Sequence, residues 1–169
     1  AVQPSDKELL TDPNFHAQNA YAIVMRTLGA FEFALGRRIG WGFDSHQLQV
    51  APHAFAVANA FYSRRDQALL FGYTGPREKT VFTCLSHDVV AHETTHAVLD
   101  GLRSRYMEPS SIDQIAFHEG FADVIALLSI FALEDVVSTL LDVGAKKSKE
   151  GLIAKAKTTA EALQDSPLL

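Results

Sequence analysis

The run His92-Glu93-Thr94-Thr95-His96 constrains the fold more than any other part of the sequence. Residues four apart lie on one face of an α-helix, so a helix here would present the imidazoles of His92 and His96 to one metal ion. Zinc binds neutral imidazole readily, usually with four ligands and with nitrogens at about 2.0–2.1 Å. Glu93 would reach a zinc-bound water without contacting the metal, which suits a general base. The run therefore predicts a helix that binds zinc.

The flanking residues support this helix. Ser86 is a plausible N-cap, Asp88 is an acid suited to the first turn, and Gly101 can interrupt the helix near its end. We therefore expect the helix to begin near Ser86 and to end near Gly101.

A second helix, longer and more apolar, is expected over residues 112–133. Glu119 and Asp123 share one face of it, and a carboxylate in an apolar helix is costly to bury unless something pairs with it. A metal-bound histidine usually donates its second ring nitrogen to a carboxylate or a carbonyl group. We therefore predict Glu119 as the third metal ligand, and Asp123 as the hydrogen-bond partner of a motif histidine, with His92 preferred.

Other residues offer alternatives at this site. His118 is a rival third ligand, but neighbours on a helix point about 100° apart, so only one of His118 and Glu119 can face the metal. Glu119 is favoured because Asp123 shares its face. Asp100, four residues after His96, is either a further carboxylate partner of the site or a solvent-facing acid. The remaining histidines are expected to lie at the surface or to form hydrogen bonds rather than to bind metal: His16, His46, His53 and His87.

Three segments together resemble the thermolysin-like family of zinc metallopeptidases. These are residues 88–100 (DVVAHETTHAVLD), residues 119–123 (EGFAD) and, upstream, residues 59–62 (NAFY). The resemblance implies a zincin-like domain that hydrolyses peptide bonds with one Zn²⁺ per chain. It also implies that residues 59–62 form a substrate-binding edge strand, in which Asn59 and Ala60 hydrogen-bond the backbone of an extended peptide or protein substrate.

The resemblance is incomplete towards the C-terminus. Tyr106 would correspond to the family's transition-state-stabilising tyrosine, although the loop that carries it is longer than usual. The family also takes a catalytic histidine from a C-terminal helical domain, and no histidine follows His118 here. We therefore expect the N-terminal catalytic half only, with a further domain or subunit completing the cleft. Asp88 matches a calcium-binding acid, but Ile130 replaces its partner, so calcium is not expected at the family's double site.

Composition fits a single zincin-like domain over residues 1–169, with an irregular lead-in at 1–13 and a helical tail at about 150–165. The formal net charge is −5 and acidic and basic residues are well mixed along the chain, which argues against a nucleic-acid partner. Runs of apolar residues are too short for us to expect a membrane span. Cys84 is the single cysteine, which excludes an internal disulfide. Without a second thiol, a zinc–thiolate site is not expected.

The expected architecture is α+β, because strand-like segments come first and helices follow. A helix is predicted at 15–37, and short strands at 48–50, 56–62 and 68–73 would form a small antiparallel sheet with an edge strand. Residues 63–67 would form a hairpin turn between the last two strands.

Two functions from different classes agree with these features. One is a zinc metalloendopeptidase in which Glu93 is the base. The other is a zinc-binding domain that recognises a peptide or protein without cleaving it, or cleaves it only with a partner. Glu93 favours the first, because a structural metal site needs no base, and the missing C-terminal histidine favours the second. The family resemblance implies secretion, while the residues themselves fix no compartment.

Overall fold

The computed structural model describes residues 4–103, 105, 108 and 110–142. Residues 1–129 form one compact unit and residues 130–169 form another. In the second unit, residues 134–142 are helical. The helical tail predicted at about 150–165 lies outside the described residues.

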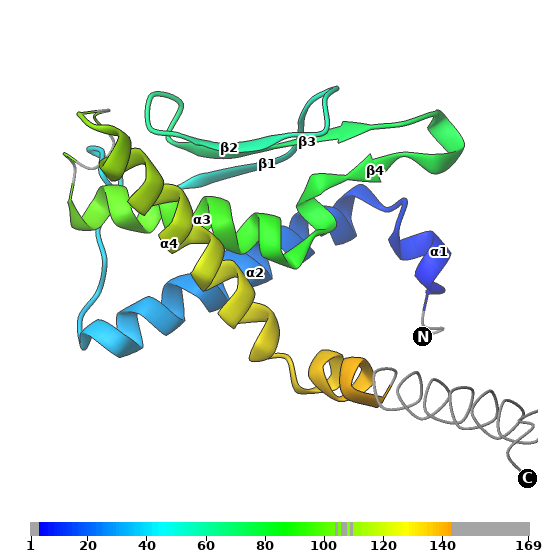
Figure 1. Cartoon of the computed structure of the whole chain (residues 1–169). Coiled ribbons are helices and arrows are strands. Elements are labelled where there is room, and N and C mark those ends of the chain that lie inside the picture. Colours follow the sequence, from blue (N-terminus) through cyan, green and yellow to red (C-terminus); the bar gives the residue numbers. More distant parts are fainter. Residues whose placement is uncertain (1–3, 104, 106–107, 109, 143–169) are drawn as a thin grey trace, which may run out of the picture. The chain divides into compact units, whose positions relative to one another are not determined.

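The chain is a mixed α+β protein, as predicted, with its strands and helices arranged as Figure 1 shows. Part of the lead-in that was expected to be irregular is helical, because Ser5 and Glu8 form a capping box. In chain order the elements are α1 (Asp6–Leu9), α2 (Pro13–Leu35), β1 (Gln49–Phe55), β2 (Ala60–Ser63), β3 (Ala68–Thr74), η1 (Arg77–Lys79), β4 (Val81–Phe82), η2 (Thr83–Leu85), α3 (His87–Leu102) and α4 (Ile112–Phe131).

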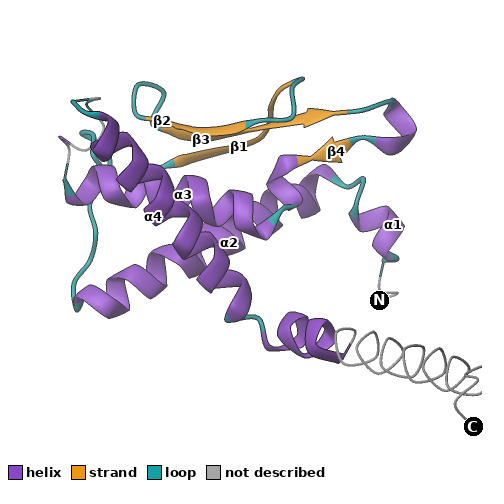
Figure 2. Ribbon diagram, in the orientation of Figure 1, coloured by secondary structure: helices purple, strands orange, loops and turns teal. Residues whose placement is uncertain are grey.

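The sheet is mixed, with the strand order β1-β3-β2 and with β4 paired to β3 (Figure 2). β2 is antiparallel to β3, as expected for a hairpin, but β1 is parallel to β3. The prediction of an antiparallel sheet was therefore wrong for the β1–β3 pair. β3 inserts between the two earlier strands because its consecutive apolar residues suit a central strand that is covered on both faces.

Helix α2 has clear signals at both ends. The Asp12 carboxylate accepts a hydrogen bond from the N–H of Asn14, and Pro13 occupies the first turn, where its missing N–H costs nothing. At the other end, Gly36 adopts a φ of +64°, in the left-handed region that glycine enters most easily. The helix therefore begins and ends within two residues of its predicted bounds.

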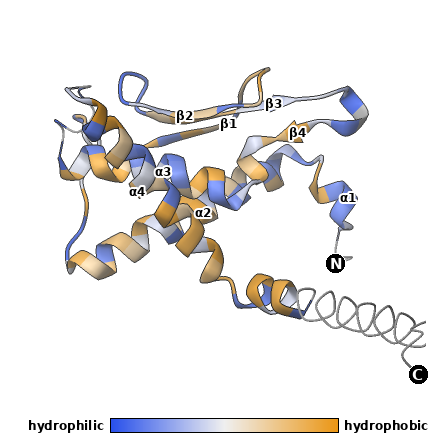
Figure 3. Cartoon of the chain, in the orientation of Figure 1, coloured by the Kyte–Doolittle hydropathy of each residue, from blue (hydrophilic) through white to orange (hydrophobic). Residues whose placement is uncertain are grey.

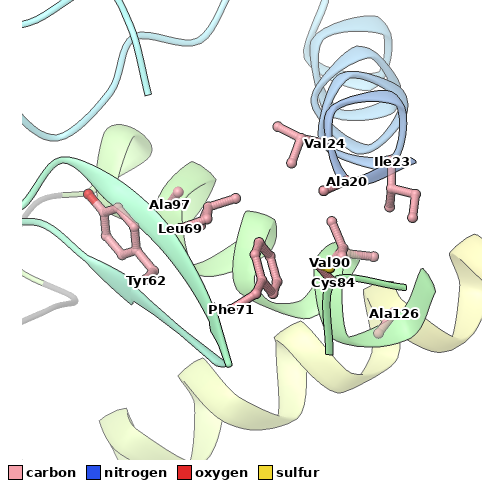
Figure 4. Packing of buried hydrophobic residues seen from close by; sticks show 11 residues of the cluster. Ala20, Ile23, Val24, Tyr62, Leu69, Phe71, Cys84, Val90, Ala97 and Ala126 are labelled. Carbon is pink, nitrogen blue, oxygen red and sulfur yellow. The ribbon is translucent and has the colours of Figure 1, made fainter. Parts of the chain in front are cut away.

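The core joins α2, the sheet and α3, and α4 contributes one residue to it (Figure 4). Helices α2 and α3 pack against each other, and each also contacts a strand. The buried members of the core are Ala20, Ile23, Val24, Tyr62, Leu69, Phe71, Cys84, Val90, Ala91, Ala97 and Ala126. Because α3 contributes fully buried residues on both sides of the histidine motif, the motif is held on a rigid element.

Helix α4 is apolar along much of its length (Figure 3). By length and hydropathy alone it could cross a membrane, a test that the core helix of a soluble protein also passes. Only 17% of its most apolar window is buried within the structure. Its exposed large apolar residues in the first unit are Ile112, Ile115, Phe117, Val124, Leu127 and Leu128.

Candidate metal centre

Three ligand atoms converge between α3 and α4. The Nε2 atoms of His92 and His96 are 2.9 Å apart. Glu119 Oε2 lies 3.4 Å from the first and 3.6 Å from the second. Ligand atoms bound tetrahedrally to zinc at about 2.0–2.1 Å are separated by about 3.3 Å. The residues therefore fit a tetrahedral zinc ion, with a fourth position left for a water or a substrate.

The surroundings of the two histidines bear on how each could bind a metal ion. His92 Nδ1 lies 2.9 Å from Asp123 Oδ1, and an ionised carboxylate only accepts hydrogen bonds, so the proton of neutral His92 is on Nδ1 and Nε2 is bare. Burial, with smaller contributions from the neighbouring His118 and His92, lowers the pKa of His96 to about 3. His96 is thus neutral at physiological pH.

The two carboxylates of α4 are not buried, contrary to the assumption behind their assignment. The side chain of Glu119 is 58% exposed and that of Asp123 is 74% exposed. The face of α4 over the site is open, so neither carboxylate needs a partner to offset desolvation. Glu119 and Asp123 are placed at this site instead by their short distances from the nitrogens of the His92 ring.

Histidine 118 does not join the convergent atoms, although the sequence made it a rival ligand. Its ring is stacked on that of His96, with centroids 4.5 Å apart and planes inclined by 12°. It is buried, and burial lowers its pKa. Within the described part of the chain, its Nε2 has no hydrogen-bond partner. The structure therefore brings Glu119, and not His118, to the two motif nitrogens.

Glu93 faces the same space from α3. It is buried, and its Oε2 accepts a hydrogen bond of 3.0 Å from the backbone N–H of Tyr62 in β2. Burial raises the pKa of Glu93, while His92 and the Tyr62 N–H act in the opposite direction. A carboxyl whose pKa is raised towards neutrality is better suited to exchange a proton than an ordinary surface glutamate.

A cavity of about 400 Å³ connects these groups with β2. Among the described residues, β2 pairs along one edge only, with β3, and Tyr62 directs its N–H away from that pairing, towards Glu93. Alternate residues of a strand direct their backbone groups to the same side, so Ala60 also faces the open edge. Its N–H is held by the side-chain oxygen of Asn59 at 2.9 Å. The lining residues are Asn59, Ala60, Phe61, Tyr62, His92, Glu93, His96, His118 and Glu119.

Asp100 anchors the C-terminal part of α3 to the sheet. Its buried Oδ2 accepts a hydrogen bond of 2.6 Å from the hydroxyl of Tyr62 and lies 3.4 Å from Arg64 Nε. A Cβ at Gly42 would overlap this carboxylate, so the close approach requires glycine. Asp100 therefore bonds to β2 rather than to His96, whose Nδ1 has no partner in the described residues.

The role of Tyr62 was missed in the sequence. Its backbone N–H donates to Glu93 and its hydroxyl donates to Asp100, and burial, together with Asp100, raises the pKa of the Tyr62 hydroxyl. The sequence offered one signal for this role: Tyr62 lies two residues after Ala60, so in a strand the two residues face the same edge. Tyr106, predicted to stabilise the transition state, lies outside the described residues.

A comparison with protein families agrees with this geometry. The model of the thermolysin metallopeptidase catalytic domain matches residues 12–100, from the start of α2 into α3 past the histidine motif, which is more than half of the chain. Comparisons with curated proteins and with solved structures found no match. Glu119 and Asp123 lie beyond the matched residues. That family is zinc-dependent, and His92, His96 and Glu119 form a group that could hold a metal ion. The chain belongs to the thermolysin metallopeptidase family.

Proposed function

We propose that this chain is a zinc-dependent endopeptidase in which Glu93 is the general base. The observation that carries the proposal is the convergence of His92 Nε2, His96 Nε2 and Glu119 Oε2 beside the Glu93 carboxylate in one cavity. A purely structural zinc site needs neither a base nor an open position. This site has both, and it opens onto an unpaired strand edge.

His92, His96 and Glu119 would hold the ion. When bound, zinc lowers the pKa of a water towards about 7 and polarises the scissile carbonyl. Glu93 accepts the proton of the attacking water and delivers it to the departing amine. The N–H of Tyr62 fixes one oxygen of this carboxylate, and the other would carry out the transfer. Asp123 keeps the proton of His92 on Nδ1, which leaves Nε2 free for the metal.

The substrate is a polypeptide in extended conformation. β2 supplies an edge strand beside the site, and an extended chain can add to such an edge through main-chain hydrogen bonds. Ala60 presents its backbone to this edge, and Asn59 lies at the rim of the same cavity. A substrate held here would run past Glu93, with its scissile carbonyl over the three ligand atoms.

A second, partner-dependent function is supported by the surface of α4. The helix that contributes Glu119 leaves large apolar residues exposed, among them Val124, Leu127 and Leu128. Apolar surface of this extent beside a cleft is typical of a face covered by another polypeptide. In this partner-dependent function, a further domain or subunit completes the cleft. The chain alone would then bind zinc and peptide but cleave slowly.

The test is peptide-library cleavage by the zinc-loaded chain, its Glu93→Gln variant and the control Glu134→Gln. Glu134 is exposed and lies outside the site, so its variant should match the wild type. Glu93→Gln should keep its zinc and its fold but lose cleavage. Unchanged turnover in Glu93→Gln would exclude Glu93 as the base. Binding of library peptides without any cleavage by the wild-type chain would favour the partner-dependent function.

A further inference from the structure

A second group of metal-ligand side chains lies outside the cleft. His16 comes from α2, His53 from β1 and Cys84 from η2. One ligand atom of each lies within 4.8 Å of a ligand atom of the other two. We propose that His16, His53 and Cys84 form a second metal site, which binds zinc through two imidazole nitrogens and one thiolate. None of the three lines the cleft, so the proposal is independent of the peptidase function.

The orientation of His16 is that of a metal ligand. Its side chain is fully buried, and its Nε2 lies 3.1 Å from the backbone carbonyl oxygen of Leu10. A carbonyl oxygen can only accept, so the proton of neutral His16 is on Nε2 and its Nδ1 is bare. Metal-bound histidines are held in this way, with the second ring nitrogen donating to a carbonyl or a carboxylate. The bare Nδ1 faces His53 Nε2 at 2.8 Å.

A hydrogen bond between the two imidazoles accounts for this distance in the metal-free chain. The N–H at His53 Nε2 donates a hydrogen bond to His16 Nδ1, so both of these nitrogens have a partner. Metal binding requires His53 to carry its proton on Nδ1, a change of tautomer that leaves its charge unchanged. Cys84 loses its thiol proton to solvent as the metal–sulfur bond forms, so one proton is released for each metal ion bound.

The donors and their surroundings select the class of metal. A thiolate with two imidazoles suits zinc and similar borderline ions, whereas calcium and magnesium require oxygen ligands. The ring of Phe82 packs against both histidines, with centroids 4.5 Å from His16 and 4.8 Å from His53. Cys84 is fully buried and His53 is exposed, so a water can complete the coordination from the side of His53.

The site would tie three separate segments together at the start of the catalytic helix. Cys84 lies in the turn η2, directly before α3. His16 lies in α2 and His53 in β1, and both of these elements contact η2. A metal ion here would fix the N-terminal end of α3 relative to α2 and β1. Its role is therefore structural, and its loss should lower thermal stability rather than change the chemistry of the cleft.

A metal ion bound here would go against two expectations drawn from the sequence. His16 and His53 were expected to be hydrogen-bonding or surface residues, and a lone cysteine argued against a thiolate site. The two histidines are 37 residues apart and Cys84 is further along the chain, so no local spacing marks the group. Only the packing of α2, β1 and η2 brings the three side chains together.

The experiment is a titration of the metal-free 169-residue chain with Co²⁺, which reports thiolate ligation by a sulfur-to-cobalt charge-transfer band in the near ultraviolet. The wild type should bind two equivalents, one of which produces the band, and Zn²⁺ should displace it. His53→Ala should bind one equivalent and lack the band. His92→Ala should also bind one equivalent but keep the band. The control His46→Ala, at an exposed histidine outside both groups, should match the wild type.

The outcomes separate this proposal from the peptidase proposal. Absence of the charge-transfer band in the folded wild type, or a band of full intensity in His53→Ala, would overturn the second site. Loss of metal in His92→Ala concerns only the cleft. Cys84→Ser tests the thiolate directly, and far-ultraviolet circular dichroism checks its fold. If that variant unfolds because Cys84 is in the core, His53→Ala decides, because an exposed side chain can be removed without opening a cavity.

Discussion

The backbone N–H of Tyr62 donates a hydrogen bond to the Glu93 carboxylate across 3.0 Å. This bond connects the strand edge proposed to bind substrate with the residue proposed to move the proton. A peptide aligned along β2 is therefore positioned relative to the base by the same strand that orients the base. Correct placement of reacting groups is worth several orders of magnitude in rate, so a shift of β2 should affect catalysis as well as binding.

Removing a ligand of the α3 site should abolish metal binding there. His92→Ala, His96→Ala and Glu119→Ala should each lower the zinc content by one equivalent relative to the wild type, as measured by elemental analysis after dialysis. Glu134→Ala, at an exposed glutamate outside the site, is the control. Full retention of zinc by the Glu119→Ala protein would move the third-ligand role to His118 or to another residue.

Replacing Asp123 should weaken the same site without abolishing it. Asp123→Ala removes the acceptor that lies 2.9 Å from His92 Nδ1, so the ring is no longer held in the metal-binding tautomer. Loss of such a partner typically costs about 10–100-fold in metal affinity. Competition with a chelator measures this change, with Asp135→Ala as the control. An affinity equal to that of the wild type would show that Asp123 does not orient His92.

The metal-free chain should lose stability in acid through His96. Its pKa in the folded protein is about 3, below the ordinary value of 6.5, so between these values the unfolded chain binds a proton that the folded chain does not. Stability is therefore fully present above about pH 6.5 and falls as the pH is lowered towards 3. Urea unfolding across this range should show a weaker pH dependence for His96→Gln than for the control His46→Gln. Equal slopes would contradict the assignment.

Removing the Tyr62 hydroxyl should destabilise the protein without affecting the metal. Tyr62→Phe leaves the buried Asp100 Oδ2 without its 2.6 Å donor, and an unsatisfied buried polar group costs about 1–3 kcal/mol. The contact with Glu93 is made by the backbone, so zinc content should be unchanged. Urea unfolding provides the measurement, and Tyr21→Phe, at an exposed tyrosine, is the control. Equal stability of the two variants would show that the bond contributes little.

The features that depended on local spacing could be predicted from the sequence. The helical interval of four residues between His92 and His96, and again between Glu119 and Asp123, placed these side chains on common faces of α3 and α4. The structure then brings those faces together. Their metal-binding roles stay predictions, and the exposure of the two acids was not foreseen, because the open face of α4 depends on what packs against it.

Pairing between distant segments could not be predicted in the same way. β1 pairs with β3 in parallel, and β3 takes the central position in the sheet because it is apolar on both faces. No local pattern in β1 specifies which strand lies beside it. The same holds for Asp100, whose hydrogen bond to Tyr62 joins residues 38 apart in the chain.

The open edge of β2 also exposes the protein to pairing with itself. Main-chain groups on an edge strand can pair with any extended segment, including the same edge of another copy, which is a common route to aggregation. β2 is only four residues long, and the charged residues Arg64, Arg65 and Asp66 follow it directly. A short strand followed by charges limits the length of such a ladder, so the edge can remain available to a substrate while disfavouring extended assembly between molecules.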